Sequence, residues 1–245
     1  MITGWNALVT GGSSGIGAAI AEVLSGAGCS VVIVGRDRDR LADLATRTGA
    51  QVLVADLCTP EGLSRAATAA TQVDLLVNAA GRGWCGQLCA MRETDIEALV
   101  ALNLTAALQL TRAALPGMRQ RGRGHLVFVS SIATVGVGGE AVYAATKAGL
   151  RAFADSVRNE VVADGIGVTT LLPGAVRTPF FEHRGVPYSR RFPRQIDPAV
   201  VAEALVRAVQ RNQAEVFTPR WLSVPARLHG ALPGLFHRLA GRFGS

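Results

Sequence analysis

Lysine is almost absent from this chain. The 245 residues include 24 arginines but a single lysine, Lys147. A composition biased toward Arg, Ala and Gly accounts for the ratio as a whole. Tyrosine is nearly as scarce, with two residues, and one of them is Tyr143. The surroundings of the retained lysine are therefore the first place to look for chemistry.

Other scarce features exclude whole classes of protein. Charged residues make up 18% of the chain and apolar residues 49%, which excludes an intrinsically disordered chain. There is no long uncharged apolar run and no basic segment followed by an apolar run with a cleavage site, so we predict neither a transmembrane helix nor a signal peptide. We expect free thiols, no metal site and a cytoplasmic location, because the cysteines form no CxxC pair and have no histidines at zinc spacing: Cys29, Cys58, Cys85 and Cys89.

The positive charge is unevenly distributed. The net charge is +7, of which +6 falls in residues 180–245 and +1 in residues 1–179. A nucleic-acid-binding protein would have basic residues along its main fold, so this distribution argues against such a partner. It is compatible with a basic C-terminal segment that contacts another surface.

Short β-branched runs alternate with longer helical stretches along the chain. The predicted strands cover residues 5–10, 30–35, 51–55, 74–77, 125–129, 168–172 and 216–218. The predicted helices cover residues 15–27, 37–49, 60–70, 93–119, 141–163 and 198–212. Because the strands are apolar on both faces, we expect an α/β fold with a doubly wound parallel sheet of the Rossmann type, with about seven strands and helices on both faces. A catalytic domain is predicted over residues 1–219, with a lid at 174–196 and a tail at 220–245.

A glycine-rich turn joins the first predicted strand to the first predicted helix. Glycine permits a sharp turn and a close approach to a pyrophosphate, and the helix start supplies free N–H groups. Three glycines alone are a weak signal, but their position between strand and helix predicts a dinucleotide site. The predicted contacts are Gly11, Ser13, Ser14, Gly15, Ile16 and Gly17.

The end of the second strand bears on the choice of cofactor. In dinucleotide-binding folds an acidic residue there binds the ribose 2′-hydroxyl, whereas an arginine accommodates a 2′-phosphate. Gly35 occupies the expected acidic position and Arg36 follows it. A guanidinium binds phosphate through two parallel hydrogen bonds, so we expect NADP(H) in preference to NAD(H). Two alternatives stay open: Asp37 reaches the 2′-hydroxyl, or Arg36 is a solvated charge paired with Asp37 or Asp39.

Tyr143 precedes the single lysine by four residues. On a helix this spacing puts both side chains on one face, about 5–6 Å apart. The charge of Lys147 favours the phenolate, so we expect the pKa of Tyr143 to fall from its reference near 10 toward neutrality. Such a phenol is a general acid/base suited to ketone–alcohol chemistry. The alternative is a Tyr–Lys pair on a solvated helix face.

With these motifs the chain resembles the short-chain dehydrogenase/reductase family over residues 3–218. The run Asn78-Ala79-Ala80-Gly81 matches the family's NNAG, with Ala79 in place of its second Asn, and the run from Pro173 to Thr178 resembles its nicotinamide-binding loop. The resemblance implies that the catalytic residues are Asn103, Ser131, Tyr143 and Lys147. It implies further cofactor contacts at Asp56, Leu57, Asn78, Ala79, Gly81, Tyr143, Lys147, Pro173, Gly174, Val176 and Thr178.

The same resemblance implies a mechanism but leaves the serine ambiguous. Ser131 would polarise the substrate carbonyl, Tyr143 would transfer the proton, Lys147 would tune Tyr143 and bind the nicotinamide ribose, and Asn103 would support a proton relay. The family's serine lies about thirteen residues before the tyrosine, which is the spacing of Ser130, whereas alignment of the strand end favours Ser131. Neighbours on a strand point to opposite faces, so one of them reaches the substrate, and we choose Ser131.

The substrate side is less informative. The lid contains three phenylalanines, which indicates either an apolar or acyl-chain substrate or simple packing of the lid, and residues 82–91 are the expected second wall. Residues 233–242 have helical apolar spacing with a basic opposite face, typical of a helix at a membrane surface or on a partner. A tail packed on a subunit or over the active site is the alternative, and we expect a homodimer or homotetramer.

These observations predict an NADPH-dependent oxidoreductase that interconverts a ketone and a secondary alcohol by hydride transfer. A 3-oxoacyl-carrier-protein reductase stays open, because acidic carriers suit basic surfaces. A non-catalytic nicotinamide-sensing protein would have a degraded Tyr–Lys pair, and the pair is intact. A sugar-nucleotide epimerase or dehydratase normally has a larger C-terminal domain. The resemblance does not identify the substrate.

Overall fold

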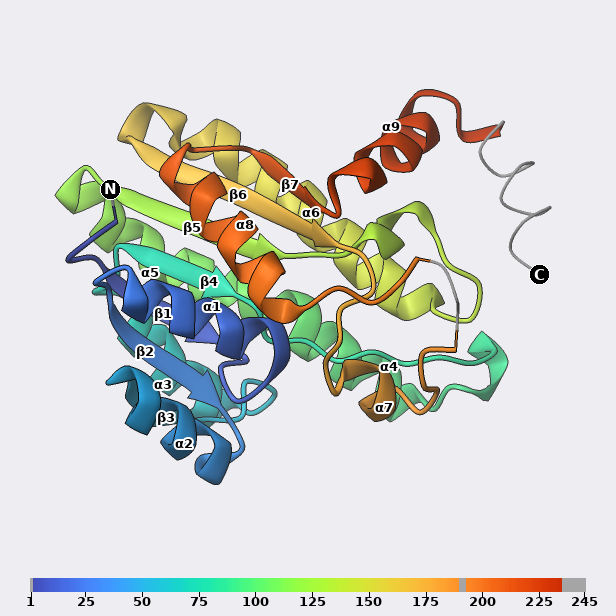
Figure 1. The fold of residues 1–245 in the computed structure, drawn as a ribbon, viewed down its shortest axis with the longest axis horizontal. Coiled ribbons are helices and arrows are strands. Elements are labelled where there is room, and N and C mark those ends of the chain that lie inside the picture. Colours follow the sequence, from blue (N-terminus) through green and yellow to red (C-terminus); the bar gives the residue numbers. More distant parts are fainter. Residues whose placement is uncertain (1, 190–192, 235–245) are drawn as a thin grey trace.

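A computed structural model describes residues 2–189 and 193–234 of the chain. Its centre is a parallel sheet of seven strands in the order β3-β2-β1-β4-β5-β6-β7 (Figure 1). The reversal of strand order beside β1 creates a crevice at the carboxyl edge of the sheet, where such folds bind their ligands. The strands are β1 (Asn6–Thr10), β2 (Ser30–Gly35), β3 (Gln51–Val54), β4 (Leu75–Asn78), β5 (Gly124–Val129), β6 (Ile166–Pro173) and β7 (Glu215–Thr218).

Helices cover both faces of the sheet. Successive strand residues point to opposite sides, so each strand contributes apolar side chains to both faces. In β1, Ala7 and Val9 belong to one apolar core and Leu8 to the other. The first core packs under α1 (Gly15–Gly26), α2 (Arg38–Thr48) and α8 (Pro198–Gln210). The second packs under α3 (Pro60–Ala70), α5 (Ala106–Arg121) and α6 (Ala141–Val161). The predicted doubly wound parallel sheet is confirmed.

Helix starts follow from local sequence. The side chains of Asp37, Thr59 and Asp197 accept hydrogen bonds from the first turns of α2, α3 and α8, and proline follows two of these caps as the first helical residue. These signals explain why α2, α3 and α8 begin within one residue of their predicted starts. The other long helices and the seven strands also lie within a few residues of their predicted positions. Further elements were not predicted: the short helix α7 (Phe180–His183), the tail helix α9 (Ser223–Ala231) and several single 3₁₀ turns.

The predicted long helix at residues 93–119 is a composite. It consists of α4 (Glu93–Val100), a π-helical turn (Ala101–Thr105) and α5. By length and composition Glu93–Arg121 meets the criteria for a membrane span, although the sequence predicts none. In the fold α5 packs against α3 and the sheet, with Leu110, Ala114 and Met118 fully buried. This packing accounts for its apolar composition, and the π turn marks a local widening of the helix at Asn103.

The described part of the tail contains the helix α9, which begins at Ser223. Pro225 lies in the first turn of α9, where a proline costs no helical hydrogen bond. Leu222 and Ala226 pack on Ile132 and Val135, which follow β5. In Figure 1, α9 extends beyond β7 toward the C-terminus. Most of the predicted amphipathic stretch at 233–242, like Phe192 of the lid, lies outside the described residues.

Candidate active site

The glycine turn after β1 has no room for side chains. Gly11 and Gly15 have left-handed φ angles of 69° and 59°. A Cβ on Gly17 would lie 2.3 Å from the carbonyl oxygen of Gly11, and a Cβ on Gly11 would lie 2.9 Å from the Ala80 backbone. The turn therefore lies flat against the end of β4, with the N-terminus of α1 above it. Free N–H groups at that helix start fit a pyrophosphate.

Thr10 joins this turn to the end of β4. Its hydroxyl accepts hydrogen bonds from the backbone N–H groups of Ala79 and Ala80, both at 3.0 Å, and donates to the carbonyl of Val77 at 3.3 Å. Thr10 is not among the predicted cofactor contacts, because its role is to hold backbone and not to touch a ligand. The buried Asn78 donates to the hydroxyl of Thr111 at 3.5 Å. These contacts hold the two strand ends that flank the crevice.

The residues after β2 bring two arginines to the mouth of the crevice. Arg36 and Arg40 both line the cavity there. The Arg36 guanidinium lies 3.6 Å from the Asp56 carboxylate, and its side chain is 72% exposed. Asp37 instead caps α2 by accepting the N–H of Arg40 at 3.1 Å, and it also pairs with the Arg40 side chain. Arg36 therefore pairs with Asp56, not with either aspartate considered from the sequence.

The π turn between α4 and α5 positions Asn103. Its side chain is buried, accepts the backbone N–H of Arg82 at 2.9 Å and donates to the Arg82 carbonyl at 2.9 Å. It also donates to the hydroxyl of Thr146 on α6 at 3.2 Å. A Cβ on Gly81 would lie 3.3 Å from both Asn103 and Lys147. The segment after β4 thus lies directly against Asn103 and Lys147, two of the residues predicted to be catalytic.

The two serines at the end of β5 have different surroundings. Ser130 is buried and donates to the carbonyl of Lys147 at 2.8 Å, which ties β5 to the backbone of α6. The Ser131 hydroxyl accepts the N–H of Ala133 at 3.1 Å, and Ser131 lies close enough to the Tyr143 side chain to lower the pKa of its phenol. Ser131 therefore faces the phenol, and Ser130 faces away from it.

The expected effect of Lys147 on Tyr143 is absent. Burial raises the pKa of Tyr143 above its ordinary value, and the neighbouring Ser131 hydroxyl offsets this only in part. Burial also lowers the pKa of Lys147 to about 8. The Lys147 ammonium lies 5.8 Å from the Tyr143 ring centroid and donates to the Val129 carbonyl at 2.8 Å. Desolvation outweighs the lysine's charge because the phenol is covered by the lid, which the sequence spacing does not reveal.

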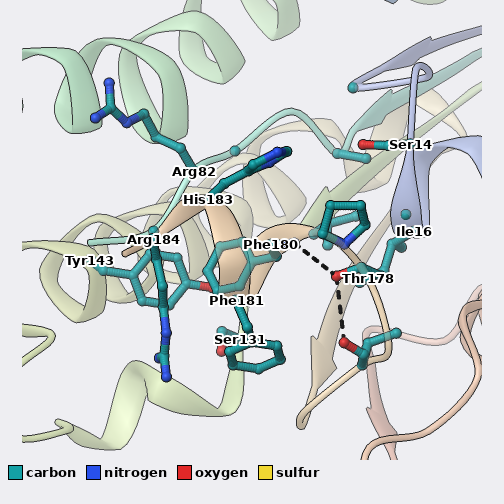
Figure 2. A pocket seen from close by; sticks show the side chains of 18 of the residues that line it. Ser14, Ile16, Arg82, Ser131, Tyr143, Thr178, Phe180, Phe181, His183 and Arg184 are labelled. Carbon is teal, nitrogen blue, oxygen red and sulfur yellow. Dashed lines mark hydrogen bonds between the residues drawn. The ribbon is translucent and has the colours of Figure 1, made fainter. Parts of the chain in front are cut away.

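The loop after β6 reaches the glycine turn from the opposite side. Gly174 at its start donates to the carbonyl of Thr218 at 2.8 Å. Val176 forms a bridge with Ile196, and Thr178 lies against Gly15, where an added Cβ would be 3.1 Å from its methyl group. Thr178 also accepts the N–H of Phe180 at 3.4 Å, shown as a dashed line in Figure 2. This loop leads directly into the lid.

The lid helix α7 is docked over Tyr143. The rings of Phe180 and Tyr143 have centroids 5.4 Å apart, and Phe181 packs edge-on against Phe180 (Figure 2). Arg184 at the end of α7 forms a nearly buried ion pair with Glu140, the residue before α6, with 10% and 14% of the two side chains exposed. This pair, 44 residues apart in sequence, was not predicted.

A single cleft of about 790 Å³ joins these groups. It runs from Arg36 past the glycine turn to Ser131, Tyr143 and the lid. Of the 20 predicted site residues, 18 line it, and 14 of these precede the loop after β6: Gly11, Ser13, Ser14, Gly15, Ile16, Gly17, Arg36, Asp56, Leu57, Ala79, Gly81, Ser131, Tyr143 and Lys147. The later loop adds Pro173, Gly174, Val176 and Thr178, whereas the buried Asn78 and Asn103 lie behind the wall.

The cleft fits a dinucleotide on steric grounds. A Cβ at Gly12 would lie 2.8 Å from Ile33, and one at Gly35 would lie 3.1 Å from the Ser13 hydroxyl, so neither position, in the turn or at the end of β2, has room for a side chain. Glycines at these places let a dinucleotide approach the backbone closely. Gly35 stands where many dinucleotide-binding folds have an acidic residue, and here Ser13 occupies the space that such a side chain would need.

Comparison with known proteins places the chain in a family. The model for short chain dehydrogenases matches residues 6–186. An uncharacterized oxidoreductase of Staphylococcus epidermidis is 32% identical over 83% of this chain and 90% of its own. The structure of a short-chain dehydrogenase from Sphingobium yanoikuyae in complex with NADPH has a TM-score of 0.83 and 30% identity, over 94% of this chain and 95% of its own. The bulky-bulky ketone specific alcohol dehydrogenase from Comamonas testosteroni has a TM-score of 0.80 and 28% identity, over 94% of each chain. The chain therefore belongs to the short-chain dehydrogenase/reductase family and is an NAD(P)-dependent oxidoreductase.

Proposed function

We propose that this protein interconverts a bulky apolar ketone and the corresponding secondary alcohol, with NADP(H) as its cofactor. The observation that supports this most directly is the contact of Ser131 with Tyr143 at the end of the cleft opposite Arg36, with Lys147 one helical turn further along α6. Two neighbouring hydroxyl groups beside a buried ammonium suit a reaction in which a carbonyl oxygen gains or loses a proton.

Each residue has a distinct part in this reaction. The bound nicotinamide supplies or accepts the hydride. Ser131 donates a hydrogen bond to the substrate oxygen, and Tyr143 gives that oxygen its proton or takes it away. Lys147 binds the nicotinamide ribose. Asn103 holds the backbone beside the site in place and supports the relay of protons to solvent.

The residues after β2 support NADP(H). Asp37 is held as the cap of α2 and in an ion pair with Arg40, so its carboxylate is already engaged. Arg36 keeps a largely exposed guanidinium at the mouth of the cleft. A 2′-phosphate would compete with Asp56 for that guanidinium, and a dianion binds it more strongly than a carboxylate does. The structural neighbour from Sphingobium was solved with NADPH.

The lid supports a bulky apolar substrate. Phe180, Phe181, Val186 and Tyr188 line the cleft beyond Tyr143. Apolar walls of this kind take up an apolar group because its burial removes surface from water. The Comamonas neighbour is named for bulky ketones. We further propose a homodimer or homotetramer in the cytoplasm, no nucleic-acid partner, and a tail that contacts a subunit or a membrane surface.

The test is a screen of ketones for NADPH oxidation, with Tyr143→Phe as the matched blank. We expect turnover of ketones with large apolar groups on one or both sides. Tyr143→Phe keeps the ring packed against Phe180 but removes the proton, so turnover should fall by at least about a hundredfold. Wild-type protein that oxidises no NADPH with any ketone, or a Tyr143→Phe variant as active as wild type, would contradict the proposal.

A further inference from the structure

Most of the charged groups at the substrate end of the cleft are held in ion pairs. Among the described residues, Arg82, Glu140, His183 and Arg184 are the acidic and basic side chains that line this end beyond Tyr143. Arg82 pairs with Asp95 at 3.4 Å, and Asp95 also binds Arg92 at 2.8 Å. His183 lies on the exposed side of α7. Glu140 and Arg184 are the charged pair nearest the rings that cover Tyr143.

The side chain of Arg184 is held in place by several neighbouring residues. Its Nη1 donates to Glu140, and its Nε donates to the carbonyl of Val186 at 3.0 Å. The guanidinium lies over Phe181, 4.7 Å from the ring centroid. A Cβ on Gly83 would lie 3.1 Å from the Cβ of Arg184, so the loop after β4 also confines it. Figure 2 shows Arg184 extending past Tyr143 beside the lid rings.

The electrostatic consequence follows from this pairing. A guanidinium that is 10% exposed would be a strong site for a carboxylate, because little water screens it. Glu140 already occupies it, and Glu140 is itself 14% exposed. A second carboxylate would have to displace Glu140 and leave that charge unpaired in a nearly buried position, which is costly. An uncharged ketone meets no such obstacle.

We propose that Glu140, by binding Arg184, makes the substrate end of the cleft selective for uncharged ketones. Glu140 is then a specificity-determining residue for the reaction proposed above, on which this inference rests. Removal of its charge frees the Arg184 guanidinium beside the substrate and opens the cleft to ketones that carry a carboxylate. If the Arg184–Glu140 pair served only to pack the lid, its loss would lower kcat/KM for charged and uncharged substrates by the same factor.

The test compares phenylglyoxylate with its methyl ester, which present the same ketone with and without a negative charge. The measured quantity is the ratio of kcat/KM for the ester to kcat/KM for the acid. We expect Glu140→Gln to lower this ratio by roughly 10- to 100-fold, the worth of one hydrogen bond to a charged group. Glu182→Gln, on the exposed side of the same lid helix, makes the same change in net charge and should leave the ratio within about twofold.

A second pair of variants keeps the proposal testable if Glu140→Gln folds poorly. Arg184→Met leaves the Glu140 carboxylate free, whereas Arg184→Met with Glu140→Gln has no charge at either position. The first should have an ester-to-acid ratio roughly tenfold above that of the second, because only the first repels the acid. Equal losses on both substrates with unchanged ratios would show a packing role and overturn the proposal.

Binding measurements separate this inference from the proposed function. The dissociation constants of mandelate and methyl mandelate, the matching alcohols, are measured by calorimetry on the wild type and Glu140→Gln with NADP⁺ present. Absence of NADPH oxidation with any ketone would contradict the proposed reaction. A ratio of these dissociation constants that does not change in Glu140→Gln would contradict the role of Glu140, whatever the reaction.

Discussion

The two edges of the sheet use buried polar groups in opposite ways. At the amino edge, Asp74 binds Arg121 and Arg123 and accepts the backbone N–H of Asn6 at 3.1 Å. Nearby, His125 is hydrogen-bonded to Thr169 at 2.8 Å, and Thr169 donates to the Gln213 carbonyl. These groups form closed networks between β1, β4, β5 and β6, far from the cleft.

At the carboxyl edge the polar groups are less fully paired. The Asn78 Oδ1 atom is buried and accepts no hydrogen bond from the described residues. Lys147 and Tyr143 are both buried. Burial raises the pKa of Tyr143 and lowers the pKa of Lys147, which favours the neutral form of each side chain. The comparison indicates that the amino edge stabilises the fold, whereas the carboxyl edge keeps polar groups available for a ligand. The two edges should therefore respond differently to substitution.

The two adjacent serines give the largest expected difference. Ser131→Ala should lower kcat/KM by roughly a thousandfold, because it removes a hydrogen-bond donor beside the reacting oxygen. Ser130→Ala removes a bond to the Lys147 carbonyl and should cost about 1 kcal/mol of stability with little loss of turnover. Steady-state kinetics and urea unfolding of both variants check this. The reverse pattern would assign the catalytic role to Ser130.

Features set by local sequence could be predicted, whereas contacts between distant segments could not. The strands, the glycine turn and the Tyr–Lys spacing are local patterns, so they were predictable from periodicity and from residue types with few alternatives. Thr10 and the Glu140–Arg184 pair act across long separations, and no local pattern marks them. The direction of the Tyr143 pKa was wrongly predicted for the same reason: the residue that covers the phenol, Phe180, lies on a distant lid.

At the amino edge, Asp74→Asn should lower the free energy of unfolding by about 3 kcal/mol, because it breaks a buried ion pair shared by two arginines. Its effect on kcat/KM should be small below the unfolding transition. Glu203→Gln is the control: its pair with Arg207 on α8 is more than half exposed, so the expected loss is below about 0.5 kcal/mol. Urea unfolding measures both losses. Equal losses would show that the buried network adds nothing beyond a surface pair.

His125 should make the amino edge sensitive to acid. Burial, with a smaller contribution from the charge of Arg158, lowers its pKa to about 4, against 6.5 in an unfolded chain. Between these values the unfolded state binds more protons, so stability falls as the pH drops from about 6.5 to about 4, by up to roughly 3 kcal/mol. His125→Gln removes this titration. Unfolding curves at several pH values should show a shallower loss for the variant, and parallel curves would contradict the assignment.

The smallest expected effect is at the carboxyl edge, where Arg36 is exposed. It tests whether exposure limits the contribution of a charged side chain to cofactor binding. Arg36→Ala should raise the KM for NADPH by about tenfold and leave the KM for NADH nearly unchanged, because only NADPH has a 2′-phosphate. The effect is modest because the Arg36 side chain is 72% exposed and water screens it. Arg38→Ala, which removes a neighbouring arginine outside the cleft lining, should change neither value. An equal rise for both cofactors in Arg36→Ala would mean that Arg36 serves the shared part of the dinucleotide, and the preference for NADP(H) would then lose its structural basis.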